Sequence, residues 1–303
     1  MKPSDPHYIH GTRHREQQRL RRLNALLNAG SLEAMALGGG ERILDVGAGL
    51  GLLGRLMAHA AGSRGVVVGV ERDTVQIAAA RRLAREEGEA GRVDFRQGSA
   101  ECLPLEDDEW GTFDLVHARF LLEHVTDPLA VVRGMMRAVK PGGRVILEDD
   151  DHALLRLSPE PDGVMKIWRA YYLTYRKQGK DPFVGRHLVR LIHQAGGRPR
   201  RNRRLSFGSC SGNVHFAAMV DNFIAILEGA RAEMVDSGLA HRMEIDRGLE
   251  AFHAWQQRPD AALWYSTAWA EGQRPLLAER REMNRPGAAG GSTSGARETL
   301  AGS

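Results

Sequence analysis

The sequence predicts an α/β domain built on a doubly wound, mostly parallel seven-stranded sheet, with a helical extension before it and a helical cap after it. Between residues 41 and 150, short runs rich in Val, Ile and Leu alternate with amphipathic segments of helical length. A glycine-rich turn joins the first run to the first helix, where such sheets bind ligands. The 303 residues, 42% of them apolar, suffice for one large domain with a subdomain.

The expected elements follow in chain order. The first five strands are Arg42–Val46, Gly65–Val70, Val93–Gln97, Phe113–His117 and Arg144–Glu148, and the helices between them are Leu52–Ala61, Thr74–Glu87 and Pro128–Val139. Asp127 and Pro128 supply an N-cap and a first-turn proline, and the glycines of Lys140–Gly143 end that helix. Later helices are expected over Asp162–Gln178, Val184–Ala195 and Asn213 to about Gly238, with further strands at Arg203–Phe207 and Ala261–Glu271. We expect these helices to cover the sheet edge.

Residues 1–40 are expected to form a helical extension that acts as a lid. Leucines at helical spacing mark Gln17–Leu27, Gly30 follows as a stop, and a second helical turn is expected over Ser31–Leu37. The chain then divides into this extension, a cofactor-binding core (41–150), a cap with the last two strands (151–284) and a disordered Gly/Ser/Ala-rich tail (285–303).

Composition argues against several classes of protein. No apolar run approaches the roughly 20 residues that span a bilayer, and the first residues lack the apolar core of a signal peptide. Two cysteines, Cys102 and Cys210, provide neither a disulfide framework nor a zinc cluster. We therefore expect a cytoplasmic protein that has no membrane partner; a homodimer is compatible with the sequence.

One cluster of positive charge stands out, the five arginines within Arg198–Arg204. Such a cluster suits a phosphate-binding patch. It also suits a solvated turn and edge strand, where positive charge blocks edge-to-edge pairing. Because no zinc finger, basic zipper or RNA-recognition pattern accompanies the cluster, we expect no nucleic-acid partner.

The glycine turn reads Asp45-Val46-Gly47-Ala48-Gly49-Leu50-Gly51. Glycine lets a ligand touch backbone that a Cβ would shield. A dinucleotide-binding loop would need a third glycine at position 52, which is leucine here. S-adenosylmethionine (SAM) carries no pyrophosphate, and its ammonium suits a nearby carboxylate such as Asp45. The loop favours SAM over NAD, whereas Glu71, which follows the second strand and could accept both ribose hydroxyls, fits either cofactor.

From Glu41 to about Asp150 the chain resembles the UbiE-like class I methyltransferases. The matching motifs are the glycine loop with Glu41 and Asp45, Glu71, Gly98-Ser99-Ala100-Glu101-x-Leu103-Pro104, Phe113-Asp114-Leu115-Val116, Leu122-Glu123-His124-Val125-x-Asp127-Pro128 and Lys140-Pro141-Gly142-Gly143. The resemblance implies a Rossmann-like class I methyltransferase fold, SAM as cofactor and S-adenosylhomocysteine as product. It implies cofactor contacts from Asp45, Gly47, Ala48, Gly49, Gly51, Glu71, Arg72, Ser99, Ala100, Glu101, His117 and Ala118.

Two features of this resemblance concern the cofactor further. The family commonly has an Asp, which meets the adenine amino group, where this chain has Ser99. Ser99 could accept the same hydrogen bond more weakly, and the Ala100 N–H remains available. The opening Tyr8-Ile9-His10-Gly11 is similar to the start of a subset of bacterial methyltransferases, in whose relatives an aromatic residue lies over SAM. We expect Tyr8, His10 and Arg19 to close the site; the alternative is a terminus with incidental aromatics.

Methyl transfer from a sulfonium has a neutral leaving group, so alignment and exclusion of water can supply most of the rate and no metal is expected. A general base helps when the acceptor is a hydroxyl or an amine. The candidate catalytic residues follow the fourth and fifth strands: His117, Arg119, Glu123, His124 and Asp149. His124 could instead pack its helix, and Arg119 could form a surface ion pair.

Two more groups of side chains are open to alternative interpretations. The four acids Glu148–Asp151 should repel one another and shift their pKa values, although they lack the spacing of a metal site. The residues Trp168, Tyr171, Tyr172 and Tyr175 share one helical face, which is either core or an aromatic wall for a flat substrate.

We therefore expect SAM-dependent methylation of a small molecule, an aromatic or heteroaromatic natural product such as an indole or a phenol. Two covering elements imply an enclosed pocket that a protein or RNA would find hard to enter. The alternatives are a quinone-precursor or lipid methyltransferase, and a SAM-binding regulatory or nucleic-acid module that uses the arginine cluster. The acceptor atom is open among O, N and C.

Overall fold

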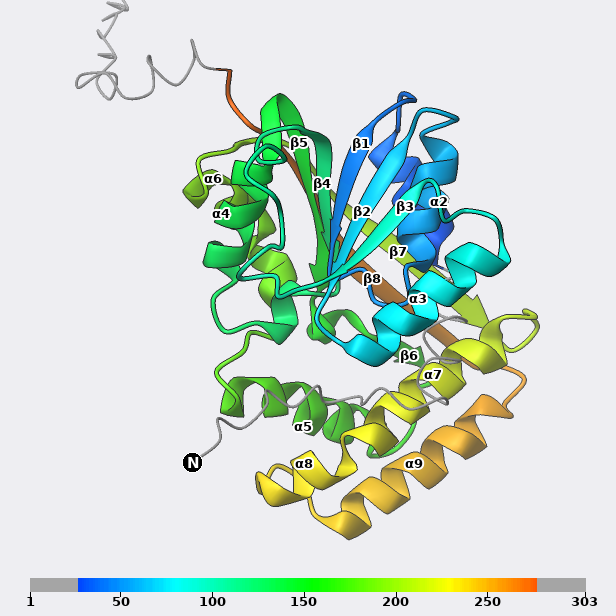
Figure 1. The fold of residues 1–303 in the computed structure, drawn as a ribbon. Helices are drawn as coiled ribbons and strands as arrows, with labels where there is room; N and C mark the ends of the chain where they lie inside the picture. The colour runs from blue at the N-terminus through cyan, green and yellow to red at the C-terminus, as the bar shows by residue number, and fades with distance from the viewer. Residues whose placement is uncertain (1–26, 277–303) are drawn as a thin grey trace, which may run out of the picture.

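The computed structural model describes residues 27–276, which form a three-layer α/β fold with a helical cap at one end of the sheet (Figure 1). The first half contains β1 (Arg42–Val46), α2 (Leu52–Ala60), β2 (Val66–Glu71), α3 (Thr74–Glu86), β3 (Val93–Gln97), β4 (Phe113–Arg119), the 3₁₀ turn η1 (Leu122–His124), α4 (Pro128–Ala138) and β5 (Val139–Asp150). These elements confirm the predicted alternation, although β4 and β5 run further than expected.

The second half contains both the cap and the end of the sheet. It comprises η2 (His152–Leu154), β6 (Arg156–Ser158), α5 (Val164–Lys177), η3 (Val184–His187), α6 (Leu188–Gln194), β7 (Arg198–Cys210), α7 (Phe216–Gly229), α8 (Arg231–Asp236), α9 (Arg242–Gln256) and β8 (Ala262–Gln273). None of the helices within residues 27–276 is long and apolar enough to cross a membrane.

The sheet runs in the order β3-β2-β1-β4-β5-β8-β6, and β7 pairs with β8 along its whole length. Strands β1 to β5 pair in parallel, whereas β8 is antiparallel to β5, β6 and β7. The predicted doubly wound sheet is confirmed. It has eight strands and not seven, because β6 adds a three-residue strand beside the start of β8. The order of the strands reverses between β1 and β4, where a ligand crevice is expected.

Helices cover both faces of the sheet. On one face α4 and α6 pack through Val131, Met135 and Ile192. On the other, the helical residues 27–35, α2 and α3 pack over Ile43, Val67 and Leu115 in β1, β2 and β4. These apolar strand residues alternate in direction along each strand, and this fixes which side chains face each helical layer.

The cap has a core of its own. Helices α5, α7, α8 and α9 gather at one end of the sheet in Figure 1 and bury large side chains such as Trp168, Tyr171, Phe223 and Phe252. Tyr265 of β8 joins the same core, so the last strand links cap and sheet. Hydrophobic burial thus holds the cap in place over the edge where the strands end.

Several predicted helix boundaries were wrong. Residues 27–35 form a continuous helix through Gly30, which does not stop it; this helix ends before Ala36, whose φ is 46°. The helix expected from Asn213 is divided at Ala230 into α7 and α8, and the first turn of the helix expected from Val184 is 3₁₀. Helix α9 was not predicted. The predicted Gln17–Leu27 helix and the tail lie almost entirely outside the described residues.

Strand β7 begins at Arg198 and therefore contains the whole arginine cluster, where a turn followed by a shorter strand was predicted. Arg201 bonds Glu271 of β8 at 2.5 Å and lies over the Trp269 ring, and Arg200 bonds Gln273. Within the described part of the chain, β7 pairs with β8 alone. The cluster therefore has the positions that edge-blocking charges occupy.

Candidate active site

The glycine loop has the backbone that only glycine adopts without strain. Gly47, Gly49 and Gly51 have φ values of 78°, 54° and 68°. A Cβ on Gly51 would come within 2.2 Å of the Phe95 ring, so this glycine is required for α2 to lie close to β3. The N–H groups of Gly47 and Ala48 donate to the Val70 carbonyl at 2.8 and 2.9 Å, which ties the loop to the end of β2.

Glu71 connects the loops at the carboxyl ends of β1, β2 and β3. Its carboxylate accepts the N–H of Gly49 at 3.0 Å and that of Asp73 at 2.9 Å, and its backbone carbonyl accepts the N–H of Gly98 at 3.0 Å. Burial raises the pKa of Glu71, although the two backbone N–H groups favour the charged form. The sequence placed Glu71 at the strand end; it gave no sign that this carboxylate also fixes the glycine loop.

Asp45 and His117 face each other on neighbouring strands. They are register partners in β1 and β4, and Asp45 Oδ1 lies 2.8 Å from His117 Nδ1. Both side chains are buried, and His117 Nε2 has no partner among the described residues. The structure thus brings these two predicted site residues together, one beneath the glycine loop and one at the fourth strand; their contact with SAM stays a prediction.

Arg119 ends β4 and points under the N-terminal helix. It donates to Ser31 Oγ at 3.1 Å and to Asn28 Oδ1 at 2.8 Å, and Ser31 donates to Glu148 of β5 at 2.7 Å. Burial lowers the pKa of Arg119, and the charges of Glu148 and Asp45 oppose that shift. The side chain is therefore part of a buried network that joins helix 27–35 to the sheet, in place of the surface ion pair we had considered.

The turn after β4 brings η1 onto the glycine loop. Phe120 has a φ of 51°, which is uncommon for a non-glycine residue and turns the chain sharply. A Cβ on Gly47 would lie 3.0 Å from the Leu121 side chain, so these two segments are in close approach. Both Leu121 and Leu122 donate their N–H groups to Asp149 Oδ2, at 3.1 and 2.7 Å. Asp149 therefore holds the turn that carries Glu123 and His124.

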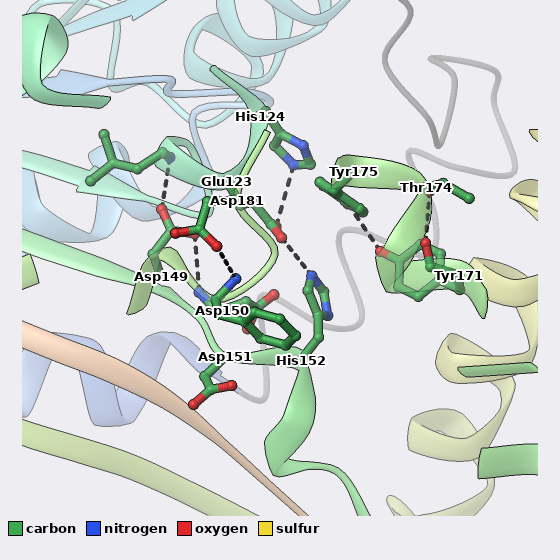
Figure 2. Close-up of polar contacts among 12 residues, drawn as sticks. Glu123, His124, Asp149, Asp150, Asp151, His152, Tyr171, Thr174, Tyr175 and Asp181 are labelled. Carbon is green, nitrogen blue, oxygen red and sulfur yellow. Dashed lines mark hydrogen bonds and ion pairs between the residues drawn. The ribbon is translucent and has the colours of Figure 1, made fainter. Parts of the chain in front are cut away.

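Glu123 is buried between two histidines (Figure 2). Its Oε2 lies 2.6 Å from His152 Nε2, and its Oε1 lies 3.5 Å from His124 Nε2. Burial raises the pKa of Glu123 to about 8, and burial lowers the pKa of His124 to about 3. The ring of His124 stacks on Tyr175 of the cap at 5.7 Å. Both predicted residues therefore lie where the sheet edge meets the cap.

The four consecutive acids Glu148–Asp151 have different partners. Glu148 accepts hydrogen bonds from the Ser31 and Thr267 hydroxyls. Asp149 accepts the N–H groups of Leu121 and Leu122. Asp151 accepts hydrogen bonds from Nε and Nη2 of Arg186, both at 2.8 Å. Asp150 Oδ1 is buried without a hydrogen-bond partner in residues 27–276. The pKa values of Asp149 and Asp150 are raised mainly by burial, with the charge of Glu123 as the next cause.

The aromatic face of α5 is core. Trp168, Tyr171 and Tyr175 are buried and surround the His152 ring, with ring centroids 5.4 to 5.6 Å from it, and only Tyr172 is half-buried. Trp168 Nε1 also donates to the His152 carbonyl at 2.7 Å. The stripe therefore encloses the acid–imidazole pair and does not form an open wall for a flat substrate.

The remaining predicted cofactor residues lie along the same edge or outside the described part. Ser99 interacts with its own loop, since its hydroxyl donates to the Glu101 carboxylate and accepts the Glu101 N–H. Ala100 follows in this half-buried loop and Ala118 is buried in β4, while the charge of Arg72 reaches His124. Tyr8, His10 and Arg19 lie outside the described residues.

His152 and Tyr265 were not among the predicted catalytic residues, although His152 ends the acidic run that follows the fifth strand. His152 Nδ1 lies 3.4 Å from the Tyr265 hydroxyl, across 113 residues of sequence. Glu123, Asp150 and His152 also bring three ligand-type atoms within 4.8 Å of one another. In the sequence, a site role for His152 was indicated only by its position directly after the acidic run that ends the fifth strand.

Replacing Glu123 by glutamine is expected to make stability depend less on pH. Because the folded-state pKa of Glu123 is raised, its contribution to stability is fully present below the unfolded value of 4.5 and is lost as pH rises through about 8. Glutamine cannot ionise, so the melting temperature of the variant relative to wild type should improve by several degrees between pH 6 and pH 9.

Thermal unfolding of both proteins across this pH range measures the effect. Glu86→Gln is the control, because that carboxylate is exposed on α3 and pairs with Arg82 on the same helix. A Glu123→Gln melting difference that stays constant from pH 6 to pH 9 would show that Glu123 is already ionised in the folded protein.

Comparisons with known proteins identify a domain within this chain. Residues 44–147 match the family profile described as a methyltransferase domain. The chain is 29% identical over 141 residues to the ubiquinone/menaquinone biosynthesis C-methyltransferase UbiE of Shewanella sediminis, covering 46% of this chain and 53% of that protein. It is 41% identical over 108 residues to the ubiquinone biosynthesis O-methyltransferase of Pseudomonas aeruginosa, covering 36% and 44%. The chain thus spans about half the length of the curated relatives it matches.

Solved structures share the fold. A candidate methyltransferase from Bacillus halodurans C-125 aligns with a TM-score of 0.54 and 19% identity, covering 82% of this chain and 99% of that one. Geranyl diphosphate C-methyltransferase from Streptomyces coelicolor A3(2), solved with Mg²⁺, geranyl diphosphate and S-adenosylhomocysteine, aligns with a TM-score of 0.51 and 15% identity, covering 90% and 85%. Residues 44–147 thus match a methyltransferase domain, and the curated relatives and this sheet order support a class I SAM-dependent methyltransferase.

Proposed function

We propose that the protein transfers a methyl group from SAM to a small molecule, specifically an aromatic or heteroaromatic compound. The observation that carries this proposal is the position of Glu123 and His124. They lie at the edge that holds the glycine loop and Glu71, and the cap helix α5 packs over them. Acid and imidazole side chains there could serve an acceptor aligned with the sulfonium methyl.

For the cofactor, we propose that Glu71 accepts the ribose hydroxyls and that Asp45 lies near the SAM ammonium. Gly47, Ala48, Gly49 and Gly51 would form the floor of the site. The three glycines support this role, because they place no side chain between the backbone and a ligand. Their positive φ values would strain most other residues. Arg72, Ser99, Ala100, Glu101, His117 and Ala118 would complete the surroundings of the adenine and the methionine part, and Arg119 would keep helix 27–35 in place beside them.

A quinone precursor is the second candidate acceptor. Both curated relatives named above act in ubiquinone biosynthesis by name, one on carbon and one on oxygen. A quinol is itself an aromatic ring with hydroxyl groups, so the same buried cluster would suit it. We also propose that the protein works in the cytoplasm, in keeping with two exposed cysteines that form no disulfide.

The test is transfer of label from methyl-labelled SAM to a panel of indoles, phenols and quinols, together with calorimetry of SAM and NAD. We expect micromolar binding of SAM, no binding of NAD, and label in at least one class of acceptor. We further expect transfer to survive EDTA, because the leaving group is neutral. Binding of NAD without SAM, or label in RNA and in none of the small molecules, would contradict the proposal.

Deleting residues 1–18 is expected to raise the SAM dissociation constant and to lower turnover. We propose that Tyr8 and His10 close over the sulfonium, where an aromatic face attracts positive charge, and that Arg19 holds the segment down. Tyr8→Phe should keep most of the affinity and Tyr8→Ala should lose it, as measured by calorimetry. Unchanged affinity and turnover in the truncated protein would assign the segment another role.

A further inference from the structure

A line of ionisable side chains runs from the cofactor edge into the cap (Figure 2). His124 lies first, with the charge of Arg72 within reach and 11% of its side chain exposed. Glu123 follows at 3.5 Å, then His152 at 2.6 Å from Glu123, and the Tyr265 hydroxyl lies 3.4 Å beyond His152. Exposure falls to 3–4% at Glu123 and His152, so only the His124 end of this line meets the site.

The inner part of this line has no positive partner to balance its acids. Among residues 27–276, no Lys or Arg forms an ion pair with Glu123 or Asp150, and Arg186 is engaged by Asp151. Lys180 lies farther away, acts on Glu123 only through its charge, and bonds Gln178. Trp168, Tyr171 and Tyr175 shield the pair from water. A buried carboxylate in such surroundings takes up a proton readily and can share it with its neighbour.

We propose that Glu123 and His152 form the site that receives the proton of the methyl acceptor, and that neutral His124 passes this proton inward. The acceptor atom is then one that carries an ionisable proton, an O–H or a ring N–H. This inference rests on the proposed methyl transfer and deepens it, because it separates such acceptors from ring carbons. His152 is here a positioning residue, since it acts through Glu123.

The acceptor lone pair attacks the sulfonium methyl, the S–CH₃ bond breaks, and S-adenosylhomocysteine leaves as a neutral thioether. The O–H or N–H proton moves to one ring nitrogen of His124 while Nε2 releases its own proton toward Glu123 Oε1. The reactive form is the fraction of enzyme in which Glu123 is ionised, and this fraction grows as pH rises toward 8. In this form Glu123 ends the step protonated and shares that proton with His152 Nε2. When the product leaves, this proton returns through His124 to solvent, which restores ionised Glu123 and the starting tautomer of His124.

The first test follows the pair without any acceptor. In protein labelled with ¹⁵N-histidine, the ring-nitrogen shifts of His152 should change between pH 6 and pH 9 with a midpoint near that of Glu123, about 8. In Glu123→Gln this change should disappear. His187, whose Nε2 lies 3.6 Å from Asp181 outside this line, is the internal control, and its ring-nitrogen shifts should be the same in both proteins. Wild-type His152 shifts that stay constant over this range would overturn the proposal.

The second test uses the O–H or N–H acceptor found with labelled SAM, and its nitro-substituted analogue, which ionises more readily. Glu123→Gln should lower kcat for the parent about 100-fold but lower it less than about tenfold for the ionised analogue, with SAM affinity unchanged. His152→Gln should move the midpoint of the kcat–pH profile. If His152 were purely structural, His152→Gln would lower the melting temperature and leave the midpoint of the kcat–pH profile unchanged.

Three further results would overturn the inference. One is equal loss of kcat for the two acceptors, and another is label found only on ring carbon. The third is activity that EDTA removes and Mn²⁺ restores, with Mn²⁺ binding lost in Asp150→Asn, because a cation would then occupy the place of the shared proton. If no small molecule accepts label, the proposed function fails instead, and the histidine titration still reports on the pair.

Discussion

Replacing Glu71 by alanine is expected to raise the SAM dissociation constant by about 30- to 150-fold. The carboxylate accepts the N–H groups of Gly49 and Asp73, so its loss frees the glycine loop as well as removing the proposed ribose partner. Hydrogen bonds to a charged group contribute roughly 1.5–3 kcal/mol each, and a net loss of about 2–3 kcal/mol gives this range. The SAM dissociation constant of Glu71→Gln should lie between those of wild type and Glu71→Ala, because the amide oxygen can still accept one N–H.

Isothermal titration with SAM measures this effect, and circular dichroism checks the fold. Glu86→Ala serves as the matched control, since it removes an exposed carboxylate on the helix that follows Glu71. If Glu71→Ala bound SAM within threefold of wild type, the cofactor would have to lie elsewhere on the sheet edge.

Replacing Arg119 by methionine is expected to lower the free energy of unfolding by about 3–5 kcal/mol. Methionine keeps much of the side-chain volume but leaves Glu148 without the positive charge buried beside it. Asn28 also loses its partner. Ser31 would still bond Glu148, so we expect helix 27–35 to detach from the sheet before the rest of the domain unfolds.

Urea unfolding followed by fluorescence measures the stability, and hydrogen exchange of residues 27–35 measures the detachment. Arg200→Met is the control, because Arg200 is exposed on β7 and bonds the neutral side chain of Gln273. A loss below about 1 kcal/mol for Arg119→Met would mean that the network is open to water.

The parallel half of the fold could be predicted because its signals are local. Strand β1 and strand β3 have the predicted bounds, and Asp127 caps α4 by accepting the Ala130 N–H as expected. The end of helix 27–35 could not be predicted in the same way. Gly30 weakens a helix by about 1 kcal/mol, and the bonds of Ser31 and Asn28 to residues far along the chain outweigh that cost.

In the candidate site, too, the residues in local motifs could be predicted and those joined by long-range pairing could not. Glu71, Glu123 and His124 lie in motifs whose place at the strand ends follows from the alternation of strands and helices. His152 and Tyr265 come together only because the antiparallel β8 returns beside β5, and no local pattern encodes that pairing. The burial of Trp168, Tyr171 and Tyr175 likewise depends on α7 and α9, the second of which was not predicted.

The position of β8 has a consequence for biosynthesis on the ribosome. This strand is among the last described elements to be synthesised, yet it lies between β5 and β7 and completes the pairing of both. Until it emerges, a nascent chain that has already formed β1 to β5 carries an unpaired hydrophobic edge along Val145–Leu147, a template for aggregation. Sequence-distant pairing of this kind closes slowly. Folding of the sheet is therefore completed after translation of the cap, and chaperone binding to the open β5 edge should protect the chain in that interval.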